Sequence, residues 1–92
     1  MKIVVNITYG GFNVPKEIEE ELYEKYGYEN DSLRTAPELI EWLESHNNEY
    51  KAGFGTHIVV EEIPETATDW LIEEYDGIET IFYVITGKIK RL

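Results

Sequence analysis

The chain has 92 residues, 42% of them hydrophobic and none of them cysteine. This length fits a single domain over residues 1–92, and the composition is that of a folded chain without disulfides, thiol nucleophiles or cysteine zinc sites. Nineteen acidic residues against eight lysines and arginines give a net charge of −11, which disfavours direct binding to nucleic acid or to anionic membranes. No apolar run is long enough to cross a membrane, so we expect no membrane anchor, and the lack of cysteine agrees with a cytosolic location.

The first segments predict a buried strand followed by an amphipathic helix. Residues 2–8, KIVVNIT, are β-branched and apolar on both alternating faces apart from Asn6, which is typical of an interior strand. Pro15 suits the first turn of a helix, and Gly27 falls where its C-cap is expected. Between these ends Ile18, Leu22 and Tyr26 form an apolar ridge at i+4 spacing, and Val14 extends it just before the proline.

The middle of the chain predicts a second helix, a loop and a second strand. Thr35 and Glu38 fit a capping box, and we expect the helix to end near residues 47–48, a pair of asparagines. Residues 49–56, EYKAGFGT, are interpreted as a loop because two glycines lie at its end. Residues 56–63, THIVVEEI, have a continuous apolar centre and precede a proline, which indicates a strand.

The last third predicts a hairpin that is apolar on both faces. Asp76-Gly77 is the strongest short-range hairpin signal, because a type I′ turn needs positive φ at both central residues. With these residues at the turn, Trp70 faces Tyr83 across the strands. One face then carries Leu71, Tyr75, Ile78 and Phe82, and the other carries Trp70, Ile72, Ile81 and Tyr83. A further turn at Thr86-Gly87 would return KIKRL as a short edge strand.

These elements predict an α+β fold of order β-α-α-β-β-β. We expect a two-layer sandwich with two helices on one face of a mainly antiparallel sheet of four or five strands. Short connections would place the second strand antiparallel to the first. Two helices cover only one face of such a sheet, so the second apolar face of the hairpin needs other cover. That face can curl over itself, be covered by a long loop such as EYKAGFGT, or pack against a second copy of the chain. The second copy is the expected solution, which gives a homodimer.

The loop between the first strand and the first helix, Tyr9 to Phe12, is a candidate binding site. A glycine pair before a helix N-terminus can bind an anion through backbone N–H groups. However, the loop matches neither G-x-G-x-x-G nor a Walker loop, and Glu17 would repel phosphate. The favoured interpretation is a tight corner in which Tyr9 and Phe12 close the core. The candidate binding residues are Tyr9, Gly10, Gly11, Phe12, Trp70 and Tyr83.

Residue types that carry catalysis are not gathered in any recognisable pattern. The two histidines, His46 and His57, have no partner at metal-ligand spacing. No serine or threonine lies in a nucleophile elbow, and the many carboxylates show no pair set in differing environments. We therefore expect no catalytic residue, no metal, no cofactor and no enzymatic activity.

Three segments resemble a family of small uncharacterised bacteriophage and prophage proteins. They are KIVVNITYGGF, RTAPELIEWL and VVEEIPETATDWLIEEYDGIE. The family pattern has a K-I-V-x-N strand running into Y-G-G-F-G, then R-T-x-P-x-L-I, and later E-I-P and E-E-Y-D-G-I-E. The chain departs from it at Asn13, where the family has Gly, at Val14-Pro15, where it has a Leu-Ser helix cap, and in its ending. The resemblance implies a phage gene product in the cytoplasm of a bacterium and brings no known activity.

Two functions of different classes remain open. The first is a non-enzymatic protein-interaction module that acts on a host, defence or phage protein. Its most specific version is an acidic inhibitor of a nucleic-acid-handling enzyme. The alternative is a binder of small molecules or nucleotide signals. The glycine loop and the basic edge formed by Lys88, Lys90 and Arg91 motivate that alternative.

Overall fold

The computed structural model describes residues 1–28, 31–53 and 55–92. It confirms the predicted α+β class, with helices and antiparallel strands in one mixed fold. Within the described residues the elements are β1 (Lys2–Asn6), α1 (Glu19–Tyr26), the 3-10 helix η1 (Leu33–Thr35), α2 (Pro37–Glu44), β2 (Glu49–Ala52), β3 (Thr56–Glu62), β4 (Asp69–Tyr75), β5 (Ile78–Ile85) and β6 (Lys88–Arg91).

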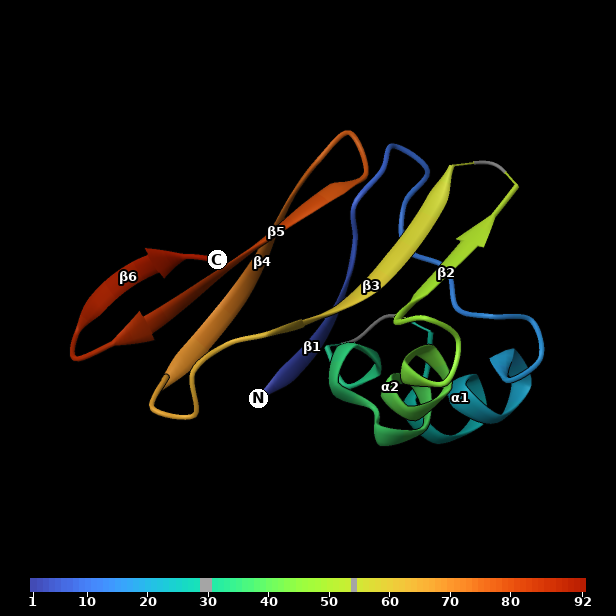
Figure 1. Cartoon of the computed structure of the whole chain (residues 1–92), viewed down its shortest axis with the longest axis horizontal. Coiled ribbons are helices and arrows are strands. Elements are labelled where there is room, and N and C mark those ends of the chain that lie inside the picture. The colour runs from blue at the N-terminus through green and yellow to red at the C-terminus, as the bar shows by residue number, and fades with distance from the viewer. Residues whose placement is uncertain (29–30, 54) are drawn as a thin grey trace.

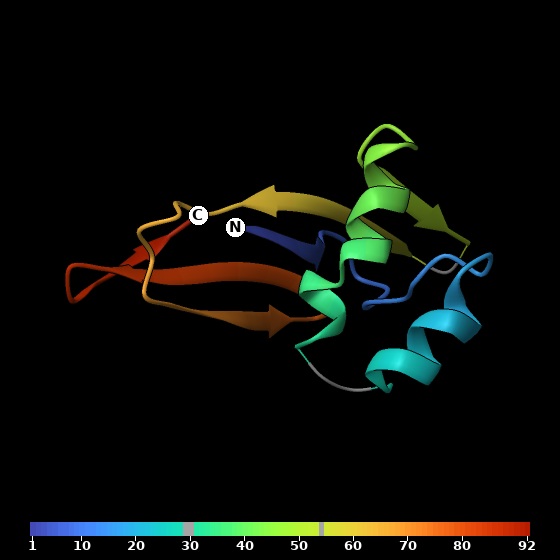
Figure 2. The ribbon, with the colours of Figure 1, turned by 90° about the horizontal axis from the view of Figure 1, so that it is seen from below.

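The strands form two antiparallel three-stranded sheets. Sheet A has the order β1-β3-β2, and sheet B has the order β4-β5-β6. β1 pairs antiparallel with β3, as the short connections predicted. The expected sheet of four or five strands is therefore divided in two, because the chain after β3 leaves sheet A. Figures 1 and 2 show sheet B beside β1 and the helices gathered around sheet A.

Sheet A lies between the helices and sheet B, and β1 is buried on both faces. Val4 contributes to a first core with the helices, whose other buried members are Val14, Leu22, Leu33, Ala36, Leu39, Leu43 and Ile58. Ile3 and Val5, which point to the opposite face, belong to a second core with Ile63 and Ile81. This alternation explains why KIVVN is apolar at successive positions rather than at every second one.

Helix α1 begins four residues after Pro15 and ends at Gly27. The segment between Pro15 and the helix is a tight turn, in which the Ile18 N–H donates to the Pro15 carbonyl at 3.1 Å. Gly27 has a φ of +84°, and its N–H donates to the Tyr23 carbonyl at 2.9 Å, which confirms the predicted C-cap. Of the predicted apolar ridge, Val14 and Leu22 are buried.

The predicted capping box of the second helix is wrong. Thr35 belongs to η1, and Ala36 occupies the N-cap of α2 without a side-chain hydrogen bond. The Glu38 carboxylate instead accepts hydrogen bonds from Lys25 Nζ at 2.7 Å and from the Tyr26 hydroxyl at 2.6 Å. The side chain that would complete the box is thus held by α1. The helix ends at Glu44, three residues before the predicted pair of asparagines, both of which have positive φ.

The interpretation of residues 49–56 as a loop is wrong for the first four. Glu49 to Ala52 form β2, an edge strand that pairs with β3 from Glu49↔Val59 to Ala52↔Thr56. This strand is only four residues long and contains no β-branched residue. It is therefore too short and too polar to show the alternation of apolar and polar residues by which a strand is recognised.

The predicted register of sheet B is confirmed. Trp70 pairs with Tyr83 and Leu71 with Phe82, while Asp76 and Gly77 at the turn have φ of 52° and 87°. Trp70, Ile72, Ile81 and Tyr83 pack into the second core. Sheet A, rather than a long loop, therefore covers one apolar face of the hairpin.

Alanine substitution of two turn glycines in sheet B separates backbone strain from steric contact. A Cβ on Gly77 would lie 2.2 Å from the Tyr9 carbonyl oxygen, whereas a Cβ on Gly87, at φ +76°, meets nothing within 4 Å. We expect Gly87→Ala to lower the free energy of unfolding by about 1 kcal/mol from strain alone. Gly77→Ala should lose about 1–3 kcal/mol more, because the loop must move. Equal losses in urea denaturation would contradict the close approach.

The bridge between the two helices predicts a pH dependence of stability. Hydrogen bonds, first from Lys25 and then from Tyr26, lower the pKa of Glu38 from 4.5 to about 2. A carboxylate whose pKa is lowered by folding stabilises the fold above its unfolded pKa, and that stabilisation is lost as the pH falls from 4.5 to about 2. We expect Glu38→Gln to lower the thermal midpoint at pH 7 and to converge with the wild type over this window.

Glu41→Gln is the control, because it removes the same charge from an exposed position on the same helix. Its thermal midpoint shows how much the loss of one negative charge changes stability without the contact to Lys25. If the two variants lose the same amount at every pH, the bridge to Lys25 contributes nothing.

Candidate functional site

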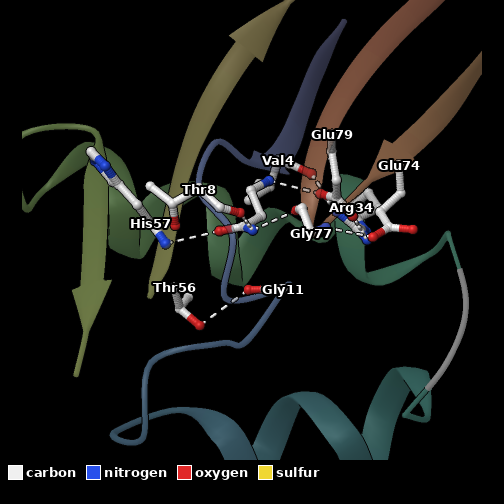
Figure 3. A network of polar contacts seen from close by, with 10 residues as sticks. Val4, Thr8, Gly11, Arg34, Thr56, His57, Glu74, Gly77 and Glu79 are labelled. Atoms are coloured by element: carbon white, nitrogen blue, oxygen red, sulfur yellow. Dashed lines mark hydrogen bonds and ion pairs between the residues drawn. The ribbon is translucent and has the colours of Figure 1, made fainter. Parts of the chain in front are cut away.

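The outer edge of β1 is sealed by side chains instead of a neighbouring strand. β1 is an edge strand of sheet A, and the Asn6 N–H and the Val4 carbonyl point away from β3. The Asn6 N–H donates to Glu79 Oε1 at 2.7 Å, and Arg34 Nη1 donates to the Val4 carbonyl at 3.3 Å (Figure 3). An open strand edge exposes unpaired backbone groups that attract other strands, so these contacts close it.

Arg34 and Glu79 form a bidentate ion pair at this edge. Arg34 Nη2 donates to Glu79 Oε2 at 2.6 Å, and Nη1 donates to Oε1. The two side chains are 16% and 6% exposed, and the guanidinium carbon lies 3.7 Å from the centroid of the Phe12 ring. Because both carboxylate oxygens already accept hydrogen bonds, Glu79 positions the surrounding segments and is not free to act as a base.

The buried amide of Asn6 connects the same edge to two turns. Its Nδ2 donates to the Thr8 carbonyl at 2.6 Å and to the Gly77 carbonyl at 2.7 Å, while its Oδ1 accepts from the His57 N–H at 2.8 Å. Asn6 is fully buried, so each of these bonds replaces one that water would have made. Asn6 is therefore polar within an apolar stretch because its amide binds three backbone groups of neighbouring segments.

The glycine loop, residues 9–12, is packed between Gly55, which precedes β3, and Gly77 in the β4–β5 turn. The Gly10 N–H donates to the Gly55 carbonyl at 2.8 Å, and Thr56 Oγ1 donates to the Gly11 carbonyl at 3.1 Å. On its other side the loop backbone touches Gly77. Its backbone groups are therefore engaged in holding the fold, which favours the structural interpretation over an anion site.

Two aromatic residues of this loop behave differently. Phe12 is half-buried against the first core, as expected, and also contacts Arg34. Tyr9 was expected to close the core, but it is 75% exposed. The positive φ of Gly11, +80°, turns the chain between the two rings so that only Phe12 points inward.

Three segments that are far apart in the sequence meet at one place, which we call the junction. It consists of Asn6, Phe12, Arg34, Gly77 and Glu79. Residues of β1 and the loop after it, of η1 and of the β4–β5 hairpin thus contact one another. Arg34 and Glu79 were not recognised from the sequence as a pair. The only local signal was an asparagine within an apolar strand.

A groove of about 340 Å³ lies next to the junction, between β1 and the β5–β6 pair. Its lining includes Glu61, Glu79, Thr80 and Arg91 beside the apolar side chains of Val5 and Ile7. The volume is at the small end of ligand sites. Two carboxylates against one guanidinium disfavour the phosphates of a nucleotide.

The outer face of sheet B is the face turned away from the second core. It carries Leu71, Glu73 and Tyr75 from β4, Ile78, Thr80 and Phe82 from β5, and Ile89 and Arg91 from β6. Leu71 is 51%, Tyr75 79% and Ile89 72% exposed. The candidate binding residues Trp70 and Tyr83 lie on the opposite, inner face. Both faces of the hairpin are apolar, and its sequence alone does not indicate which one is covered.

Other features of the described residues limit the chemistry. Within residues 1–28, 31–53 and 55–92, no group of three or more histidine, aspartate or glutamate side chains could hold a metal ion. In the same part of the chain no helix is long and apolar enough to cross a bilayer. Comparison of the chain with protein-family models, curated proteins and solved structures gave no match.

Neutralising the buried carboxylate of the junction should destabilise the fold strongly. Glu79→Gln leaves the Arg34 guanidinium buried without a counter-charge, so we expect a loss of about 3–5 kcal/mol in the free energy of unfolding. Glu44→Gln removes the same charge from the exposed Lys2–Glu44 pair and should lose far less, because water screens that pair. Similar urea midpoints for the two variants would show that the junction pair does not stabilise the fold.

Proposed function

We propose that the protein is a non-enzymatic protein-interaction module whose docking surface is the outer face of sheet B. The observation that supports this is the exposure of Leu71, Tyr75 and Ile89 on one side of three adjacent strands. Monomeric proteins rarely leave contiguous apolar patches of this kind open to water, and such patches mark interaction sites. Tyrosine and arginine, both present on this face, are enriched at protein interfaces.

The alternative, a binder of small molecules or nucleotide signals, has weaker support. The backbone of the glycine loop is engaged with Gly55 and Gly77, and the groove beside it contains more carboxylates than cations. A nucleotide would bring further negative charge to a chain of net charge −11. Docking of a protein on the outer face of sheet B does not need to overcome this charge repulsion, because burial of apolar side chains drives it.

We further propose that the module is a phage gene product that acts on a host or defence protein in the bacterial cytoplasm. The resemblance of its three segments to phage proteins supports the source. The exposed glutamates of α1, Glu20, Glu21 and Glu24, give the helix layer a negative field that would steer a basic partner towards it.

Site-specific photo-crosslinking in bacterial cells tests the docking surface. Tyr75 and Tyr28 are equally exposed, at 79% and 77%, but only Tyr75 lies on the outer face. We expect a benzoylphenylalanine at position 75 to give protein adducts and one at position 28 to give few.

A second substitution links the adduct to apolar docking. Leu71→Ser beside the crosslinker at 75 should reduce the adduct yield about tenfold or more, since burial of a leucine contributes roughly 1.5–3 kcal/mol. Equal yields from positions 75 and 28, or yields indifferent to Leu71→Ser, would overturn the assignment of the outer face as a docking surface.

A further inference from the structure

We propose that the occupant of the outer face is a second copy of this chain, in a two-fold dimer whose axis runs along β5. This inference rests on the proposed function, because it names the partner for the same surface. It follows from the distribution of charge across sheet B together with the symmetry that a dimer imposes.

The two edges of sheet B carry opposite charge. β4 and its turn contribute the acidic residues Asp69, Glu73, Glu74 and Asp76. β6 contributes Lys88, Lys90 and Arg91, and all of them are exposed. Between these edges lies β5, whose outward residues Ile78 and Phe82 are apolar. By the strand register, the outward charges are Asp69 and Glu73 on β4 and Arg91 on β6, whereas Glu74, Lys88 and Lys90 point to the inner face. The outer face therefore has acidic side chains on β4, apolar ones on β5 and one arginine on β6.

A two-fold axis along β5 brings opposite charges together. Rotation about an axis in the interface parallel to β5 exchanges the two edges, so the β4 of one copy lies over the β6 of the other. An axis in the interface perpendicular to β5 would instead place β4 over β4 and β6 over β6, which opposes like charges. The charge pattern thus selects one of the two face-to-face arrangements, and β5 pairs with itself at the apolar centre.

The strand register identifies the residues that would meet. Arg91 pairs with Phe82, and Phe82 pairs with Leu71, so these three lie in one row across the sheet. After the rotation, Arg91 of one copy lies opposite Leu71 of the other, and Glu73 is the next outward residue along the same strand. Arg91 already lines one hollow of about 360 Å³ together with Glu73 and Tyr75. Both side chains therefore lie on the outer face, where Arg91 of one copy can meet Glu73 of the other.

The size of the face predicts a weak dimer. The strands lie about 4.8 Å apart and pair over seven residues in β4–β5 but only four in β5–β6, so at about 3.3 Å per residue the face measures at most roughly 14 by 23 Å. This is below the roughly 800 Å² per partner of a standard interface, so we expect a dissociation constant on the order of micromolar. Each copy carries a net charge of −11, and added salt at moderate concentration should strengthen the dimer by screening this repulsion.

Charge reversal tests the inference in sedimentation experiments over a range of concentrations. Glu73→Arg changes the net charge from −11 to −9, and Arg91→Glu changes it to −13, whereas the double variant returns it to −11. We expect each single reversal to raise the dissociation constant about tenfold and the double variant to restore it. If only net repulsion mattered, Glu73→Arg would strengthen association instead.

Glu62→Arg is the matched control, since it makes the same change in net charge on β3, away from sheet B. It should leave the dimer intact or slightly stronger. Restoration by the double variant also excludes misfolding as the cause of the single effects, because a misfolded chain would not regain the dimer.

Two outcomes would overturn the inference. One is a wild-type monomer at every concentration and salt condition, and the other is a dimer whose strength the reversals do not change in the expected pattern. The proposed function is judged separately by the crosslinking yields. A monomer that still forms adducts from position 75 with a different protein removes only the self-association. A monomer without such adducts removes both.

Discussion

The buried ion pair between Arg34 and Glu79 holds three parts of the chain against one strand edge. Arg34 comes from η1 beside the helices, Glu79 comes from β5, and both also bond to the backbone of β1. Both side chains are largely withdrawn from water, so each charge is stabilised mainly by the other. This contact therefore links the helix layer, sheet A and sheet B, beside the two apolar cores that lie between them.

The same contact determines which face of the hairpin becomes the outer one. Glu79 must point towards β1, and alternation along β5 then directs Ile81 and Tyr83 to the inside as well. Leu71 and Phe82 are left facing outward by the cross-strand pairing. A polar interaction at one end of the strand thus decides which of two similar apolar surfaces stays available for docking, although hydrophobic burial supplies most of the stabilisation.

Local signals in the sequence predicted the elements that are specified by neighbouring residues. The Asp76-Gly77 turn and its register follow from the φ that the turn requires, and Gly27 follows from helix capping. The split into two sheets, the inward face of Trp70 and the role of Arg34 could not be found in this way. They depend on contacts between residues far apart in the chain, and a strand that is apolar on both faces carries no information about its orientation.

The separation of the junction residues along the chain has a consequence for synthesis on the ribosome. Asn6 and Glu79 are 73 positions apart, so the edge of β1 stays open until the chain has been made as far as Glu79. Until then a growing chain holds an arginine without its counter-ion beside a strand that is apolar on both sides. Such strands pair readily with other nascent chains. The residues that close this strand edge are thus made long after the strand that they protect from misassembly.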